Sequence, residues 1–224
     1  MPSTNSIEKS SNYHNAASSF SKGSKLKNRL DDKINASKLR YFLFNKPYGV
    51  LCQFTDKDGR KTIGDYYNFP KDVYPVGRLD LDSEGLLLLT NDKKLTDYLL
   101  NPGNKHEREY YVQVEGVPGF STLKQLEEGV VIECKATLPV CARIIDEPNF
   151  IERFPPIRIR KTVPASWISL TLIEGRNRQV RKMTAACGHP TLRLVRVRIM
   201  NILLDDLKPG KVKEIPAEDF YLHK

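Results

Sequence analysis

The chain has 224 residues, of which 40% are hydrophobic, so it is long enough to bury a substantial core. It contains no run of roughly 20 apolar residues and no apolar N-terminal signal segment, so we expect a cytoplasmic protein with no membrane partner. A formal net charge of +9 favours a polyanionic partner without identifying it.

The four cysteines and four histidines are scattered without the spacing of a metal site. No Cys-x-x-Cys pair occurs, and no two histidines would share one helix face. Phosphate-loop, dinucleotide-binding and serine-hydrolase motifs do not occur in the sequence either. We therefore expect no metal, and cysteines that are free and reduced.

The first 38 residues include nine serines and show no sustained hydrophobic period, so we predict a disordered tail over residues 1–38. Residues 1–40 hold eight basic and three acidic side chains, which leaves a net charge of only +4 on the remaining 184 residues. The tail either adds weak phosphate contacts or is a solvated extension. A folded domain is expected over residues 39–224.

The first half of this domain alternates strands with polar segments. Residues 39–44 and the leucine run 86–90 predict buried strands, and the polar loop 75–85 leads into the second of them. Residues 91–92 can cap a helix that stops at the turn residues 101–103.

The second half contains a strand at residues 110–114 and a helix at residues 121–128. Residues 146–164 hold four prolines among basic side chains and predict an exposed loop. Residues 166–173 alternate in polarity, as a half-buried strand does.

The last predicted elements are a helix with Asn177 as its N-cap, ending at Gly188, and a strand at residues 192–199. The break in the alternation of this strand at residues 194–195 suggests a bulge or an exposed end. Long strands with short or irregular connections and few helices indicate an α+β fold with a largely antiparallel sheet. The helix carries a basic outer face formed by Arg178, Arg181 and Lys182. Like charges at this spacing destabilise a helix, so an anionic partner or a buried carboxylate is expected beside them.

The loop before the leucine run contains three carboxylates, at Asp80, Asp82 and Glu84. Acidic residues at a strand entrance are most often turn or cap residues. A nucleophilic carboxylate in a dry cleft would need a neighbouring cation, for which arginine is well suited because it is always charged.

Three segments in the same order resemble the motifs of the RsuA-type pseudouridine synthases. They are Gly77-Arg78-Leu79-Asp80 with the following residues to Leu87, Tyr110 within residues 109–116, and residues 174–183. This resemblance implies an α+β pseudouridine synthase fold over residues 39–224, with a mixed, largely antiparallel sheet, flanking helices and a central cleft. Many relatives also carry an N-terminal RNA-binding module of the S4 type, which the 38 polar residues are not expected to supply.

The resemblance implies a role for each catalytic residue. Asp80 would be the nucleophile, attacking either the ribose or the base, with Asp82 as its local rival. Arg181 would pair with Asp80 and keep it ionised. Tyr110 would stack on the uracil and help to move a proton, and Val180 would pack beside the target.

Further motifs resemble a subgroup of the family that modifies large-subunit ribosomal RNA, which implies 23S rRNA as the partner, free or in a precursor of the large subunit, near the peptidyl-transferase region. No cofactor is implied, and we expect a monomer. The candidates for RNA contacts are Arg78, Arg158, Arg160, Lys161, Arg176, Arg178, Lys182, Arg193 and Arg196. Two alternatives are a catalytically silent ribosome-associated RNA-binding protein on the same fold and a basic structural protein of the ribosome.

Overall fold

A computed structural model describes residues 39–158, 160 and 162–221. Apart from Leu39, the described residues belong to one compact unit, Arg40–Lys224, which is the one considered below. The prediction of a tail at residues 1–38 and the candidate Lys161 lie outside the described residues. Within the described part of the chain, no helix has the length and apolar character that crossing a membrane requires.

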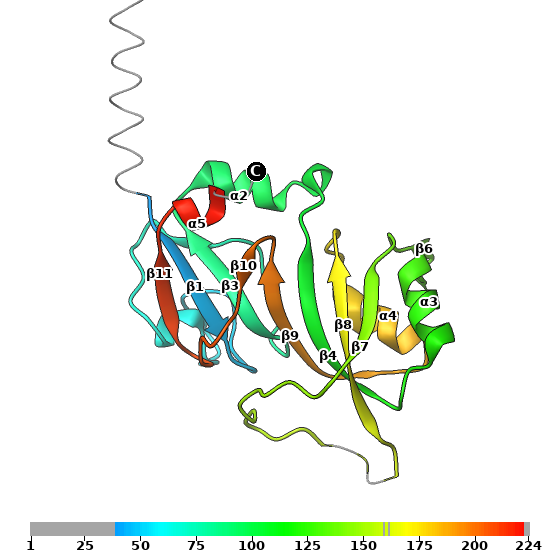
Figure 1. Cartoon of the computed structure of the whole chain (residues 1–224). Helices are drawn as coiled ribbons and strands as arrows, with labels where there is room; N and C mark the ends of the chain where they lie inside the picture. The colour runs from blue at the N-terminus through cyan, green and yellow to red at the C-terminus, as the bar shows by residue number, and fades with distance from the viewer. Residues whose placement is uncertain (1–38, 159, 161, 222–224) are drawn as a thin grey trace, which may run out of the picture. The chain divides into compact units, whose positions relative to one another are not determined.

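The unit is built on one large sheet whose main path runs β11-β1-β3-β9-β4-β8-β7 (Figure 1). All of its strand pairs are antiparallel except β3 with β9, which confirms the predicted α+β class with a largely antiparallel sheet. The strands are β1 (Tyr41–Lys46), β2 (Tyr74–Pro75), β3 (Glu84–Thr90), β4 (Arg108–Glu115), β7 (Cys141–Ile145), β8 (Ala165–Leu172), β9 (Thr191–Ile199), β10 (Ile202–Leu203) and β11 (Val212–Ile215).

Short helices flank the sheet. Figure 1 shows α3 and α4 near its β7 side, and α2 and α5 near its β11 side. A small separate hairpin pairs β5 (Val131–Ile132) with β6 (Lys135–Ala136). The helices are α2 (Lys93–Leu100), α3 (Phe120–Glu128), α4 (Gln179–Ala186) and α5 (Glu218–Tyr221), with 3-10 turns at η1 (Ile63–Asp65) and η2 (Pro102–Asn104).

Two clusters of buried side chains, one on each half of the sheet, form much of the core among the described residues, and further buried side chains such as Leu43, Leu86 and Leu88 belong to neither. The first packs aromatic and leucine side chains of β1 and β3 against the segment that follows β1. The second packs β4 and β8 against the apolar faces of α3 and α4. Tyr110 of β4 contacts both clusters, so it lies where the two halves of the sheet meet.

The two halves meet at a very short parallel contact between β3 and β9. Only Glu84 pairs with Val195 and Gly85 with Arg196 before the strands separate. Gly85 has a φ of +101°, and a β-carbon added to it would collide with the backbone oxygen and nitrogen of Arg196. Glycine is therefore required at this position both for its backbone conformation and for the close approach of the strands.

A buried ion pair reinforces this contact. Arg193 of β9 donates from Nε and Nη2 to the two carboxylate oxygens of Glu84 at 3.0 and 2.8 Å, and both side chains are less than a tenth exposed. Arg193 also donates to the carbonyl of Ile151. Glu84 and Ile151 thus occupy donors of Arg193 inside the protein, and the contact of Arg193 with RNA stays a prediction.

Most predicted elements agree with the structure to within a few residues. Asp92 caps α2 by accepting a hydrogen bond from the Leu95 nitrogen, and Gly129 ends α3 with a φ of +95°. The edge strand β7 was not predicted, because its exposed and buried residues do not alternate regularly. The register irregularities of β9 lie opposite Glu109–Tyr110 and Gln113–Val114, not near residues 194–195 as predicted.

The predicted N-cap of α4 is also wrong. Arg178, not Asn177, occupies the cap position, in a left-handed conformation with a φ of 50°. Its guanidinium reaches Asp82, 96 residues earlier in the chain. Capping rules consider only neighbouring residues, so they cannot predict a contact over this distance in sequence.

Breaking the ion pair between Glu84 and Arg193 should destabilise the fold. We expect Arg193→Met to lower the free energy of unfolding by about 3–5 kcal/mol, because it leaves a buried carboxylate without its partner. The double variant Arg193→Met/Glu84→Leu should recover a large part of this loss, since it removes both charges. Urea unfolding of both variants measures the difference, and a double variant less stable than Arg193→Met alone would contradict this account.

Candidate active site

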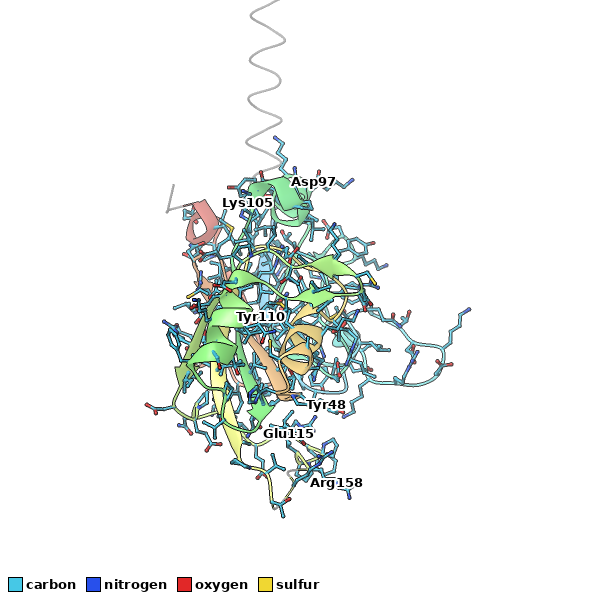
Figure 2. The ribbon with its side chains drawn as sticks, turned by 90° about the vertical axis from the view of Figure 1, so that its right-hand side faces the viewer. Tyr48, Asp97, Lys105, Tyr110, Glu115 and Arg158 are labelled. Carbon is cyan, nitrogen blue, oxygen red and sulfur yellow. The ribbon has the colours of Figure 1, made fainter. Side chains whose placement is uncertain are left out.

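A cleft of about 740 Å³ lies at the junction of the two halves of the sheet. It is lined by residues from all three motif segments, which confirms the expectation of a central cleft. Of the candidate residues, those on its walls are Arg78, Asp80, Tyr110, Arg176, Arg178, Val180 and Arg196. Figure 2 shows Tyr110 near the middle of the view, between Lys105 above and Tyr48, Glu115 and Arg158 below.

The loop that carries Asp80 is held in place through the residues on either side of it. The thiol of Cys52 bridges the backbone nitrogen and carbonyl of Leu79, both at 3.3 Å. The carbonyl of Leu81 accepts hydrogen bonds from the nitrogen of Gly49 at 2.8 Å and from Nζ of Lys46 at 3.5 Å. These contacts fix the backbone and leave the side chain of Asp80 directed into the cleft.

Asp80 and Asp82 have different environments. Asp82 accepts a bidentate pair of hydrogen bonds from Arg178 at 2.9 and 2.6 Å, and its carboxylate lies 3.4 Å from Nε of Arg181. Burial alone would raise the pKa of Asp82, but the hydrogen bonds and charges of these arginines outweigh burial and hold the pKa below its usual value. Asp82 is therefore fully engaged in structural contacts.

Asp80 is the freer of the two carboxylates. Its side chain is 37% exposed, and its nearest cation is Arg178, with Nη1 at 3.7 Å from Oδ2. Within the described residues its carboxylate accepts no hydrogen bond, so both oxygens are available to a bound molecule. This difference selects Asp80 over Asp82 as the candidate nucleophile on structural grounds that are independent of the motif.

The expected ion pair between Arg181 and Asp80 does not form in this structure. Arg181 donates from Nη2 to the backbone carbonyl of Asp82 at 2.6 Å and lies against the Asp82 carboxylate. Burial lowers the pKa of Arg181, and the charge of Asp82 opposes this shift. Arg181 therefore holds the loop from behind the cleft, while Arg178 approaches Asp80 from the cleft side.

Tyr110 and Val180 form the apolar walls beside Asp80. Tyr110 is half-buried between the two core clusters. Val180 is the second residue of α4 and is buried against the second cluster. An aromatic ring and an aliphatic side chain facing one cleft suit a flat apolar ligand with polar edges, because the ring surface can stack.

The cleft is electropositive. Six basic and two acidic side chains line it. Several of its arginines are held by backbone carbonyls and not by carboxylates: Arg176 by Ile132, Lys135 and Ala136, and Arg108 by Leu99. A carbonyl orients a guanidinium without neutralising it, so the cleft keeps an attraction for anions.

The remaining candidates lie outside the cleft. Lys182 binds Glu133 at 2.6 Å, so it is already paired. Arg158 is exposed, and Arg160 is exposed with Glu115 at 3.6 Å, both on the loop that follows β7. Both arginines are exposed enough to reach an extended partner, although Arg160 would first have to leave Glu115, as Lys182 would have to leave Glu133.

Two positively charged side chains at or next to the site were not among the predicted site residues. Arg108, at the start of β4, lines the cleft, and Lys46, at the end of β1, is fully buried. Nζ of Lys46 donates to the carbonyls of Pro47 and Val50 at 2.9 and 2.8 Å. Burial lowers the pKa of Lys46 to about 8, against the partial opposition of Cys52 and nearby carboxylates. A lysine in an otherwise buried strand was the available signal, since buried lysines are rare.

The chain belongs to the RNA pseudouridylate synthase family, whose model it matches over residues 40–186. It is therefore an RNA pseudouridine synthase, an isomerase, as the motif resemblance predicted. It is 50% identical over 183 residues to a ribosomal large subunit pseudouridine synthase E of Vibrio parahaemolyticus, an alignment that covers 82% of this chain and 76% of the relative.

Other relatives agree with this assignment. A synthase E of Xanthomonas axonopodis is 51% identical, with 75% of this chain and 89% of the relative covered. A ribosomal large subunit pseudouridine synthase B of Bacillus subtilis is 36% identical over 84% of this chain and 72% of the relative. A crystal structure of a pseudouridylate synthase matches with a TM-score of 0.66 and 26% identity, covering 82% of this chain and 73% of that one.

The lowered pKa of Lys46 makes stability depend on pH. Its folded pKa of about 8 lies below the ordinary value of 10.5, so between these values the unfolded chain holds a proton that the folded chain has lost. Stability should therefore rise with pH, by about 2 kcal/mol between pH 8 and pH 10.

The variant Lys46→Met removes this titration while keeping a side chain of similar length. We expect the stability of the natural protein relative to this variant to increase over the same pH window. Urea unfolding of both proteins at pH 8 and pH 10 measures it, and an equal difference at the two pH values would show that Lys46 titrates normally.

Proposed function

We propose that this enzyme converts a uridine of 23S rRNA, near the peptidyl-transferase region, to pseudouridine with Asp80 as its nucleophile. The observation that carries the proposal is the convergence of Asp80, Tyr110 and Val180 on one electropositive cleft. The relatives named as large-subunit synthases support the choice of RNA, because two of them are about 50% identical to this chain. The RNA is bound free or in a precursor of the large subunit.

The target uridine must leave its base stack to reach Asp80. Extrusion of a base costs a few kcal/mol and is least costly in loops and irregular helices. In the cleft, the ring of Tyr110 stacks on the uracil and Val180 packs against its edge. Contacts of the exposed Arg78, Arg158 and Arg160 with phosphates offset the cost of extrusion and position the RNA without reading its sequence.

Asp80 then attacks the ribose or the base, and the base is rejoined to the sugar through carbon. The carboxylate suits this role because it lines the cleft and accepts no hydrogen bond from the described residues, so its oxygens are open to the substrate. Arg181 positions the nucleophile indirectly by holding the carbonyl of Asp82. The reaction as proposed needs no cofactor, since the base stays in the cleft between bond breakage and bond formation.

The variant Asp80→Asn should abolish pseudouridine formation while RNA affinity changes little, because an amide is a far weaker nucleophile of nearly the same shape. Carbodiimide modification followed by primer extension on 23S rRNA measures the product, and a filter-binding assay measures affinity. Full modification by the variant would refute the assignment. RNA binding by the natural protein without any modification would instead favour the silent RNA-binding alternative.

The variant Arg181→Ala should reduce turnover as severely as Asp80→Asn, because the Asp82 carbonyl loses its donor, the Asp82 carboxylate loses a neighbouring charge and the loop of Asp80 is released. Arg181→Lys should retain part of the rate, since its ammonium can still reach one of these oxygens. Single-turnover rates at saturating RNA measure the effect. Unchanged rates in Arg181→Ala would show that Arg178 alone organises the loop.

A further inference from the structure

Arg196 is a deeply buried arginine on the wall of the cleft. It is only 4% exposed, and it pairs across the sheet with Tyr110, so the two side chains are neighbours. Its Nε donates to the carbonyl of Leu86 at 2.7 Å, which spans the point where β3 and β9 separate. Nη2 is buried without any hydrogen-bond partner among the described residues.

The other arginines of the same strand differ from Arg196 in this respect. Arg193 is paired with Glu84, and Arg198 is paired with Glu107 and Glu109. In the described part of the chain, no carboxylate lies within ion-pair distance of Arg196. Arg108 also lines the cleft, and its pKa is lowered by burial and further by the charge of Arg196.

An unpaired buried guanidinium is costly, because it has lost water without gaining a counterion. The protein keeps Arg196 in this state beside the stacking ring of Tyr110, with one terminal nitrogen unused. Such an arrangement is preorganised for a ligand that brings oxygen acceptors into the cleft, and most of all for one on which negative charge develops.

We propose that Arg196 is a catalytic residue whose guanidinium donates to a carbonyl oxygen of the extruded uracil. This proposal rests on the proposed function and assigns Arg196 to the base, not to an RNA phosphate. Its depth supports this choice: Arg196 is buried next to Tyr110, whereas Arg78 is exposed at the rim and suits the backbone of the RNA.

A hydrogen bond from Arg196 to a uracil oxygen would stabilise the negative charge that develops on the base during the reaction. If Asp80 attacks the anomeric carbon, a C–O ester bond forms, the bond from that carbon to N1 breaks, and its electron pair stays on the base. The charge of the carboxylate thus passes to the uracil, where N1, O2 and O4 share it. If Asp80 attacks the base instead, charge again develops on a carbonyl oxygen. A guanidinium at that oxygen stabilises the base in both routes.

The test is the single-turnover rate of Arg196→Met and Arg196→Lys on 23S rRNA at saturating RNA. We expect Arg196→Met to be slower by about 10²–10³-fold with an RNA dissociation constant changed by less than about threefold, as for the loss of a donor to a developing oxyanion. Arg196→Lys should be intermediate. Arg143→Met is the matched control, because it makes the same substitution at an exposed arginine that binds Glu109. Neither Arg143 nor Glu109 lines the cleft.

A second measurement separates base contact from a structural role. 23S rRNA is ligated to carry 2-thiouridine or 4-thiouridine at the mapped target, since a sulfur accepts hydrogen bonds more weakly than oxygen. One of these two sulfur substitutions should slow the natural enzyme markedly relative to unsubstituted RNA. The same substitution should change the rate of Arg196→Met much less. If that variant does not fold, a reduced thio effect in Arg196→Lys replaces it.

Three results would overturn the proposal. The first is a loss of RNA affinity in the Arg196 variants with an unchanged rate at saturating RNA, which indicates a phosphate contact. The second is full activity of Arg196→Met. The third is a thiouridine substitution that slows the natural protein and the variants by equal factors. These results are distinct from failure of the proposed function, in which the natural protein forms no pseudouridine in 23S rRNA at all.

Discussion

The structure depends on the short parallel contact between β3 and β9. Two residue pairs join the halves of the sheet there, Gly85 permits the close approach, and the buried pair of Glu84 and Arg193 reinforces it. The cleft exists because the strands separate immediately afterwards, so that Asp80, just before β3, and Arg196, on β9, face one space. The geometry of the site is therefore set by the same contact that holds the fold together, and a buried ion pair serves here mainly to fix one arrangement of the two halves.

Charge is distributed unevenly around this contact. Asp82 binds Arg178 and Arg181, and Glu84 binds Arg193. Asp80 has one cation within ion-pair distance, Arg178 at 3.7 Å, and Arg196 has no carboxylate within that distance among the described residues. The neutralised pairs build the loop and the sheet, while the unneutralised groups are those that face the cleft. The modest net charge of the folded part is thus compatible with a strongly electropositive site, because the excess is local.

The elements that sequence patterns predicted well are those defined by neighbouring residues. The leucine run of β3 and the Asp92 cap of α2 are local signals, and the structure confirms both. The structure also confirms a strand at β8, but residues 167–170 are all buried, so the half-buried alternation predicted there is wrong. The contacts that the sequence did not reveal involve partners far along the chain. Asn177 was predicted as the cap of α4, but Arg178 occupies that position and binds Asp82. Arg193 was predicted only as a phosphate contact, whereas in the structure it binds Glu84, which lies 109 residues away in sequence.

For the site, the sequence by itself determined which family the chain resembles, that Asp80 and Tyr110 belong to its motifs, and that a basic helix face accompanies them. It did not distinguish Asp80 from Asp82 on physical grounds, because both carboxylates occupy one polar loop. Only the tertiary structure decided that Asp82 is bound by arginines while Asp80 is open to the cleft, and that Arg196 is buried without a counterion. The reason is physical: residue type and spacing record which groups a chain carries, whereas desolvation and pairing depend on what the fold places beside them.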